Sequence, residues 1–241
     1  RSRIGVVMQS WRDHPKWRVR ELLAYQDSLY APFTPAGASR PWGVDDLLAA
    51  LNLDGLAEAQ IRTLSGGQRR RLDIAIGLVG RPEIVFLDEP TAGVDIEIRR
   101  GMWRTLREIN QAGTTIILTT HYLEEAESLC RNLAIIDHGR IVAEGSPQAL
   151  IREHATREVV EVRFGSTRNA AMEAELRRMT STGSANGGIE VLPDRILLYD
   201  DAGEALLDEI NRRGLNPLTS LVRRSSLEDV FLRLTGRSLI D

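Results

Sequence analysis

The 241-residue sequence is poor in several features, and each shortage narrows what the chain can do. A single cysteine, Cys130, excludes an intramolecular disulfide and favours a reducing compartment. No apolar run approaches the ~18 residues that a membrane-spanning helix needs. The formal net charge is only −3, so the chain as a whole offers no electrostatic argument for binding nucleic acid.

Lysine is equally scarce, because Lys16 is the only one and no Gly-Lys pair occurs in the chain. The 241-residue sequence therefore lacks the loop Gly-x-x-x-x-Gly-Lys-Ser/Thr. The backbone N–H groups of that loop bind phosphates, and its lysine reaches them. An arginine-containing equivalent of that pattern is absent as well. A phosphate site built from the residues present would need other groups.

What the chain does contain is 42% hydrophobic and 27% charged residues, enough for a sizeable globular core. Short apolar strands alternate with helices up to residue 155, which predicts an α/β domain with a mainly parallel sheet. The expected strands include 4–8, 84–87 and 114–120, and the expected helices begin at Gly66 and near residue 96. Strand 84–87 shows no alternation, as expected for a sheet covered on both faces.

The pattern changes beyond Ala155. Residues 157–164 alternate strictly between apolar and polar, as a half-exposed strand does. A Ser/Gly-rich segment at 180–188 predicts a loop, with further strands and helices after it. We therefore expect a boundary between a domain at 1–155 and a small α+β domain at 156–241.

Two adjacent carboxylates, Asp88 and Glu89, end the apolar segment IVFLDEP. A strand ending there places both at the carboxyl edge of a parallel sheet, where ligands of open α/β sheets bind. Asp88 suits Mg²⁺, which prefers carboxylate oxygen, and Glu89 could act as the general base for an attacking water. Taken alone, the pair is also compatible with a solvated strand end.

Three further features favour a phosphate site. In the segment LSGGQ, Ser65 can cap a helix while the amides of Gly66 and Gly67 face an anion. His121 follows an apolar strand and could hydrogen-bond a γ-phosphate, and Gln9 could ligate Mg²⁺ through its amide oxygen. The plainer alternatives are an ordinary helix cap, a capping or core histidine, and no function for Gln9.

The order of these features is more informative than any one of them. LSGGQ, LDEP, a Gly-Val-Asp turn and TTH follow one another, and this order resembles the nucleotide-binding domain of ABC ATPases over roughly residues 3–150. The matching segments are Gln9 for the Q-loop, Leu64–Gln68 for the signature motif, Ile84–Glu89 for the Walker B segment, Asp95 for the D-loop and His121 for the switch histidine. The resemblance implies a P-loop NTPase fold with a helical subdomain at about 10–80.

The same resemblance implies how ATP and Mg²⁺ would be held. In this family two domains form a head-to-tail dimer, and each ATP lies between the P-loop of one domain and the signature motif of the other. The residues expected to contact nucleotide are Ser65, Gly66, Gly67, Gln68 and Asp95. Of these, Ser65 to Gln68 would contact the ATP that the partner subunit holds. On the chain's own side, Asp88 and Gln9 would hold Mg²⁺, and the residues expected to serve hydrolysis are Glu89, His121 and Gln9.

The segment from Thr91 to Gly145 and the tail SSLEDVFLRLTGR are similar to the ATPase subunits of ABC-2 type exporters. This similarity implies a second ABC ATPase subunit, as a homodimer, and a separate transmembrane permease subunit, with no role for nucleic acid. The helical region at about 10–62 would contact the permease at the cytoplasmic, inner face of the cell membrane. Trp11 and Trp17 depart from the commoner family pattern in this region, and local packing is their alternative role.

Two other functions remain open at this point. A soluble ABC ATPase could act on ribosomes or DNA, although the single signature motif and the lack of sustained heptads count against such a protein. The chain could also be a non-catalytic regulatory module that binds through residues 156–241. For that C-terminal part, a regulatory role, dimer stabilisation and a lid are equally compatible with the sequence.

The missing phosphate loop has two explanations. In ABC domains the P-loop precedes the Q-loop, so it would belong upstream of Arg1, and we expect the sequence to be an N-terminally truncated piece of an intact ATPase. The alternative is natural loss of the loop, which should also have relaxed the other motifs. LSGGQ, LDEP and TTH are intact, which favours truncation. We expect this stretch by itself to be inactive as an ATPase.

Overall fold

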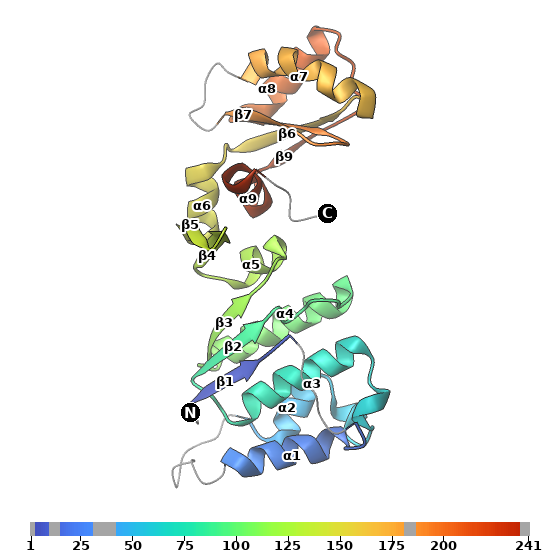
Figure 1. Ribbon diagram of the computed structural model, residues 1–241, viewed down its shortest axis with the longest axis vertical. Helices are drawn as coiled ribbons and strands as arrows, with labels where there is room; N and C mark the ends of the chain where they lie inside the picture. The colour runs from blue at the N-terminus through green and yellow to red at the C-terminus, as the bar shows by residue number, and fades with distance from the viewer. Residues whose placement is uncertain (1–2, 10–14, 31–41, 181–186, 237–241) are drawn as a thin grey trace. The chain divides into compact units, whose positions relative to one another are not determined.

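The computed structural model describes residues 3–9, 15–30, 42–180 and 187–236. Contacts divide the chain into two compact units, residues 1–125 and 126–241 (Figure 1). This division differs from the domain boundary predicted after residue 155, which stays a prediction. Trp11 and most of the loop predicted at 180–188 lie outside the described residues.

The first unit is built on a three-stranded parallel sheet in the order β1-β2-β3 (Figure 1). The strands are β1 (Ile4–Val7), β2 (Ile84–Asp88) and β3 (Thr115–Thr119). Ile4 pairs with Ile84, and Asp88 pairs with Thr119, so all three strands end at one edge of the sheet. The predicted parallel sheet is confirmed, and it collects at one edge residues that are far apart in the sequence.

Helices account for most of the remaining first unit. They are α1 (Val19–Tyr30), α2 (Val44–Ala50), α3 (Gly66–Val79) and α4 (Ile96–Gln111), with short 3-10 turns at Asp54–Leu56 and Ile61–Thr63. The helices predicted to begin at Gly66 and near residue 96 are confirmed. Each starts after a side chain that caps it, because Ser65 accepts from the Gln68 N–H and Asp95 accepts from the Ile98 N–H.

One face of the sheet is closely packed against α3, and two glycines permit the approach. Val7 and Val85 are buried on this face. A Cβ added to Gly77 would lie 2.4 Å from Cγ2 of Val7. A Cβ added to Gly5 would lie 2.1 Å from the backbone oxygen of Gly77. Contact between strand and helix therefore depends on the absence of both side chains.

The opposite face of the sheet differs from the expectation. Val6, Phe86 and Ile117 are 55%, 41% and 47% exposed, respectively. In β2 the burial alternates, with Val85 and Leu87 buried and Phe86 exposed, although the sequence of this strand is continuously apolar. Among the described residues, the sheet is therefore covered on one face, and the prediction of two covered faces is wrong for them.

The second unit begins within α5 (Leu123–Leu129) and continues into an antiparallel hairpin. Its strands are β4 (Leu133–Asp137) and β5 (Arg140–Gly145), followed by α6 (Pro147–His154). His138 and Gly139 form the turn between these strands, with φ values of 46° and 73°. Helix α6 is short and begins with a proline after its cap, Ser146.

A four-stranded antiparallel sheet in the order β7-β8-β6-β9 forms the rest of the second unit (Figure 1). Its strands are β6 (Glu158–Arg163), β7 (Gly188–Val191), β8 (Ile196–Asp200) and β9 (Thr219–Arg224). The helices are α7 (Ser166–Thr180), α8 (Gly203–Arg212) and α9 (Leu227–Thr235). The predicted α+β character is confirmed, but β9 was missed because TSLVRR carries only two apolar residues at the sheet's edge.

The two faces of this sheet bury different side chains. Val160, Leu198 and Leu206 belong to one core cluster, whereas Tyr199 and Leu232 belong to the other. Burial raises the pKa of the Tyr199 hydroxyl well above its usual range.

Of the helices described in the chain, none combines the length and the apolar character that crossing a membrane requires.

Gly5→Ala should weaken the first unit, because its new Cβ would meet the backbone oxygen of Gly77 and force β1 away from α3. We expect the free energy of unfolding to fall by about 1–3 kcal/mol, measured by urea denaturation followed by circular dichroism. The matched control is Gly101→Ala in α4, where the added Cβ meets no atom within 4 Å and the free energy should change by less than about 1 kcal/mol, toward greater stability. Equal stability of the two variants would contradict the close approach.

Candidate functional site

The three neighbouring strands of the parallel sheet end at one edge (Figure 1), and polar residues lie at or just beyond each strand end. Gln9 follows β1, Asp88 and Glu89 lie at the end of β2, and Thr119 and His121 lie at the end of β3. We call these five residues the edge cluster. Four of them were predicted as site residues, and the fold brings these four together.

The Glu89 carboxylate is the centre of the edge cluster. Its Oε2 accepts a hydrogen bond from Nε2 of Gln9 at 2.9 Å, and its Oε1 lies 3.1 Å from Nδ1 of His121. The side chain of Glu89 is 29% exposed and that of His121 is 43% exposed. The carboxylate is therefore oriented by two neighbours and still reachable by water, as a general base must be.

The backbone of Glu89 adopts an unusual conformation that directs its side chain. Its φ is +47°, in the left-handed region, which costs a non-glycine residue roughly 1–2 kcal/mol. The Glu89 N–H donates to the carbonyl of Thr119 at 3.1 Å and lies 3.2 Å from Oγ1 of the same residue. Because the strain is held by the neighbouring strand, it is consistent with a constrained functional position.

Asp88 presents its carboxylate at the same edge, where its Oδ1 accepts from Oγ1 of Thr119 at 2.5 Å. The structure shows no grouping of three or more His, Cys, Asp or Glu side chains for a metal within the ranges that it describes. One or two carboxylates, completed by water and phosphate oxygens, are the usual protein ligands of Mg²⁺. Asp88 and the amide of Gln9 therefore fit a magnesium ion that arrives with a phosphate.

The LSGGQ segment forms the N-terminus of α3. Oγ of Ser65 accepts from the Gln68 N–H at 3.3 Å, and Oε1 of Gln68 accepts from the Ser65 N–H at 2.9 Å, which makes a reciprocal capping box. Ser65 and Gly66 are exposed, and a Cβ added to Gly66 would meet no atom within 4 Å. A helix N-terminus open to solvent in this way suits an anion, although its capping serine is already engaged.

Three predicted residues stand apart from the edge cluster. Asp95 caps α4 through a 3.0 Å bond from the Ile98 N–H to its Oδ1, so its observed contact is structural. The side chains of Ser65 and Gln68 bond each other, and in the part of the chain that the structure describes no hydrogen bond joins them to the edge cluster. The hydrogen bonds of Asp95, Ser65 and Gln68 are therefore separate from those of the edge cluster.

Arg70 was not predicted, although its guanidinium donates to the backbone carbonyls of three edge cluster residues, Gln9, Asp88 and Glu89. Its guanidinium lies against the backbone that follows β1 and β2, and the residue is only 7% exposed. The signal that could have found it is helical spacing. Arg70 lies four residues before the buried Ile74, so the middle arginine of the run 69–71 faces inward.

Glu125 is a second residue that sequence reasoning missed. It is fully buried, and its Oε1 accepts from the Thr91 hydroxyl and from the Trp103 indole N–H, both at 2.9 Å. Its Oε2 has no hydrogen-bond partner among the described residues. This carboxylate connects the segment after β2, helix α4 and the segment after His121.

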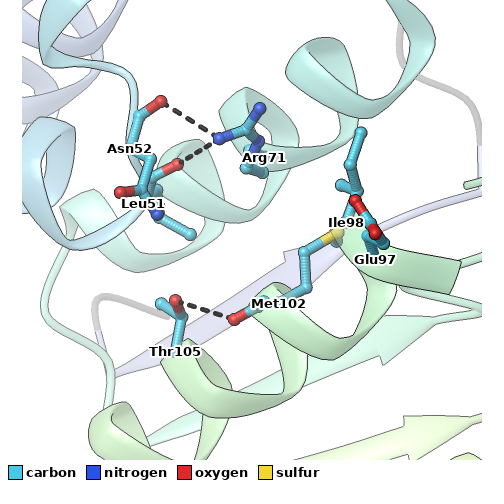
Figure 2. A pocket seen from close by; sticks show the side chains of 8 residues that line it. Leu51, Asn52, Arg71, Glu97, Ile98, Met102 and Thr105 are labelled. Carbon is cyan, nitrogen blue, oxygen red and sulfur yellow. Dashed lines mark hydrogen bonds between the residues drawn. The ribbon is translucent and has the colours of Figure 1, made fainter. Parts of the chain in front are cut away.

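A pocket of about 250 Å³ lies elsewhere in the first unit (Figure 2). Arg71 of α3 reaches across one side of it and donates to the carbonyls of Leu51 and Asn52 at 3.2 and 3.1 Å. On the other side, Met102 and Thr105 of α4 line the pocket (Figure 2). None of the edge cluster residues contributes to this lining.

Comparisons with known proteins identify the family of the chain. A family model described as "ABC transporter" matches residues 1–92, and one described as "Nodulation factor export protein NodI, C-terminal domain" matches residues 171–236. A protein of Cupriavidus metallidurans named Nod factor export ATP-binding protein I is 39% identical over 241 residues, which cover 100% of this chain and 75% of the relative. The chain belongs to the ABC transporter ATP-binding protein family.

Two further proteins with the same name support this membership. The protein of Rhizobium sp. N33 is 40% identical, with 99% of this chain and 74% of that protein aligned. The protein of Sinorhizobium fredii is 37% identical, with 100% of this chain and 66% of that protein aligned. The predicted identity, an ATP-binding and ATP-hydrolysing subunit of an ABC transporter, is thereby confirmed.

A solved ATP-binding cassette of an ABC transporter, in its ADP conformation, has a similar fold. The TM-score is 0.50 at 23% sequence identity, and the match covers 63% of this chain and 64% of that one. At this level of identity the likeness concerns the fold alone. It confirms the predicted ABC ATPase architecture of the chain.

Glu125→Ala should destabilise the first unit, because it leaves the buried donors of Thr91 and Trp103 without their acceptor. We expect the free energy of unfolding to fall by about 2–4 kcal/mol in urea denaturation, since each unpaired buried donor costs about 1–3 kcal/mol. Glu125→Gln, which keeps one acceptor oxygen at the same place, should lose less. Equal losses of unfolding free energy in the two variants would show that the hydrogen bonds of Glu125 do not stabilise the first unit.

Proposed function

We propose that Gln9, Asp88, Glu89 and His121 form the hydrolytic side of an ATP site. The observation that supports this most strongly is the approach of Gln9 and His121 to the two carboxylate oxygens of Glu89, at 2.9 and 3.1 Å. Glu89 accepts the proton of the attacking water, and His121 orients Glu89 and reaches the γ-phosphate. Gln9 holds the carboxylate from the other side.

The same edge is suited to the magnesium ion that accompanies ATP. When bound, Mg²⁺ neutralises charge on the phosphate oxygens. Asp88 contributes a carboxylate that the Thr119 hydroxyl already orients, and the amide oxygen of Gln9 is a second ligand. ATP and Mg²⁺ are therefore the cofactors of the proposed site.

Ser65, Gly66, Gly67 and Gln68 are proposed to contact the nucleotide held by a second ABC ATPase subunit. The exposed, capped N-terminus of α3 supports this role, since its free amides can receive phosphate oxygens. Asp95 is proposed to approach the nucleotide when two subunits meet, in addition to capping α4. A homodimer is the assembly that supplies these contacts from one gene product.

The transport role follows from the names of the relatives. Those relatives are Nod factor export ATP-binding proteins, and we propose that this chain likewise powers export through a separate transmembrane permease, with a Nod factor as the candidate substrate. Its helical region at about 10–62 would contact the permease, and the protein would lie at the cytoplasmic face of the cell membrane.

Residues 156–241 are proposed to form an accessory domain, with the ATPase domain at 1–155. The antiparallel sheet begins at Glu158, and the family model for a NodI C-terminal domain matches 171–236. At the start of its α9 helix, the Asp229 carboxylate accepts from the backbone N–H and the hydroxyl of Ser226.

Glu89→Gln tests the hydrolytic site in the protein expressed from its complete reading frame. Because glutamine cannot accept the proton of the attacking water, ATP turnover should fall by at least about 10²-fold while ATP affinity changes little. The variant should accumulate as an ATP-bound dimer, observed by gel filtration with ATP. Glu108→Gln, an exposed carboxylate on α4, is the matched control and should turn over normally. Normal turnover in Glu89→Gln would remove Glu89 from the mechanism.

The transport role has its own test. Purification of the tagged protein from membranes in mild detergent should recover a polytopic membrane protein as the stoichiometric partner. Mass spectrometry of the eluate identifies that partner. Recovery of ribosomes or DNA in its place would contradict export and favour the soluble ABC ATPase considered above.

A further inference from the structure

We propose that Arg70 is a positioning residue for hydrolysis, which holds the chain segments after β1 and β2 in register and links them to α3. The inference rests on the proposed roles of Gln9 and Glu89. It assigns to Arg70 no contact with nucleotide, because among the described residues its guanidinium bonds only to backbone carbonyls.

The contacts of Arg70 span two strand ends. On the β1 side, Nη1 donates to the carbonyl of Met8 at 2.7 Å and lies 3.5 Å from that of Gln9. On the β2 side, Nη2 donates to the carbonyls of Asp88 and Glu89, the latter at 2.9 Å. Nε completes the set by donating to the carbonyl of Pro90 at 3.0 Å. One planar group therefore joins the two segments that carry the ligands of the edge cluster.

The shape of the side chain matters for this role. Guanidinium presents its donors as a rigid fork, and here the fork reaches five carbonyl oxygens on two segments. The ammonium of lysine directs three donors from a single point, so it can serve one segment but not both. The site therefore requires arginine, not merely a positive charge.

The environment of Arg70 is consistent with a fixed charge. Burial lowers the pKa of Arg70, and the carboxylates of four surrounding residues oppose this shift: Asp73, Asp88, Glu89 and Glu125. An apolar side chain would fill the same volume without the cost of burying a charge. The retained arginine is therefore explained by its hydrogen bonds to the two strand ends, not by packing.

The bond from Arg70 to Glu89 acts on the conformation of the base. Glu89 is held in its left-handed conformation by its N–H, which donates to Thr119, and by its carbonyl, which accepts from Arg70 and from the Ala92 N–H at 3.1 Å. Without Arg70, the carbonyl of Glu89 keeps only the bond from Ala92, and the backbone can relax toward an ordinary φ. The carboxylate would then turn away from the position where Gln9 and His121 meet it.

The same side chain connects the edge cluster with the LSGGQ end of α3. Arg70 follows the capping Ser65 on one continuous helix, so a shift of the helix N-terminus moves the guanidinium with it. The carbonyls after β1 and β2 would follow. In a dimer whose partner nucleotide contacts Ser65 and Gly66, Arg70 thus connects the helix at that nucleotide with the backbone of Glu89.

The test compares Arg70→Lys with Arg69→Lys in the protein expressed from its complete reading frame. Arg69 is the neighbouring arginine of α3, and its Nε donates to Asp73 at 3.0 Å. We expect kcat to fall by at least about tenfold in Arg70→Lys, since small misplacements of reacting groups cost up to about 10²-fold. KM for ATP should stay within about threefold, because Arg70 touches no nucleotide. Arg69→Lys should resemble the parent protein.

A second measurement separates positioning from general stabilisation. The Mg²⁺ concentration for half-maximal turnover should rise in Arg70→Lys, because Gln9 and Asp88 lose their register, and should not change in Arg69→Lys. Arg70→Gln supplies a neutral variant that folds without a buried charge, and its kcat should also fall. Thermal melting checks that the variants compared are folded at the assay temperature.

The outcomes distinguish this inference from the proposed function. If Glu89→Gln abolishes turnover while Arg70→Lys and Arg70→Gln keep the parent kcat and Mg²⁺ dependence, the role of Arg70 is overturned and the site stands. Equal losses in Arg70→Lys and Arg69→Lys would also overturn it, as a generic effect of altering α3. If Glu89→Gln retains turnover, the proposed site itself fails.

Discussion

The hydrogen bonds of one buried guanidinium, that of Arg70, unite the parts of the site that come from different strands. Parallel strands carry their side chains to a common edge, but the segments beyond that edge have no ladder to hold them. Arg70 donates hydrogen bonds to the backbone carbonyls of those segments and thereby aligns Gln9 with Glu89. The left-handed backbone of Glu89 persists because it is bonded on both sides, by Thr119 and by Arg70.

Much of the fold was predictable because local and global signals agree in it. The capped start at Ser65 and the apolar spacing of α3 predict that helix, and the continuous apolar run of β2 predicts a strand of a parallel sheet. Two elements with weaker patterns were not predicted. Strand β9 (Thr219–Arg224) is largely polar and lies at the edge of its sheet, and the amphipathic pattern of α6 covers only two turns. Exposure of Phe86 was also unpredictable, because hydropathy does not tell which neighbours cover a face.

The candidate site was predictable where motif order carried the information. Gln9, Asp88, Glu89 and His121 lie together as expected, since strand ends of one parallel sheet must meet at one edge. Arg70 and Glu125 were missed because each acts through backbone or buried partners that only the tertiary structure brings near. Family motifs identify groups that touch ligands, whereas the residues that hold those groups leave a weaker pattern in a single sequence.

The pairing of β1 with β2 also has a consequence for biosynthesis. Ile4 finds its partner only when Ile84 has been made, which takes roughly 4–16 s at about 5–20 residues per second. During that interval the apolar strand IGVV has no sheet to join, and a long loop must close before it can. The helices between these two strands form from local contacts during that interval. Helices α1 and α2 can therefore fold before the carboxyl edge of the parallel sheet exists. A chaperone that shields the waiting strand would therefore act on the yield of active ATPase without touching the finished enzyme.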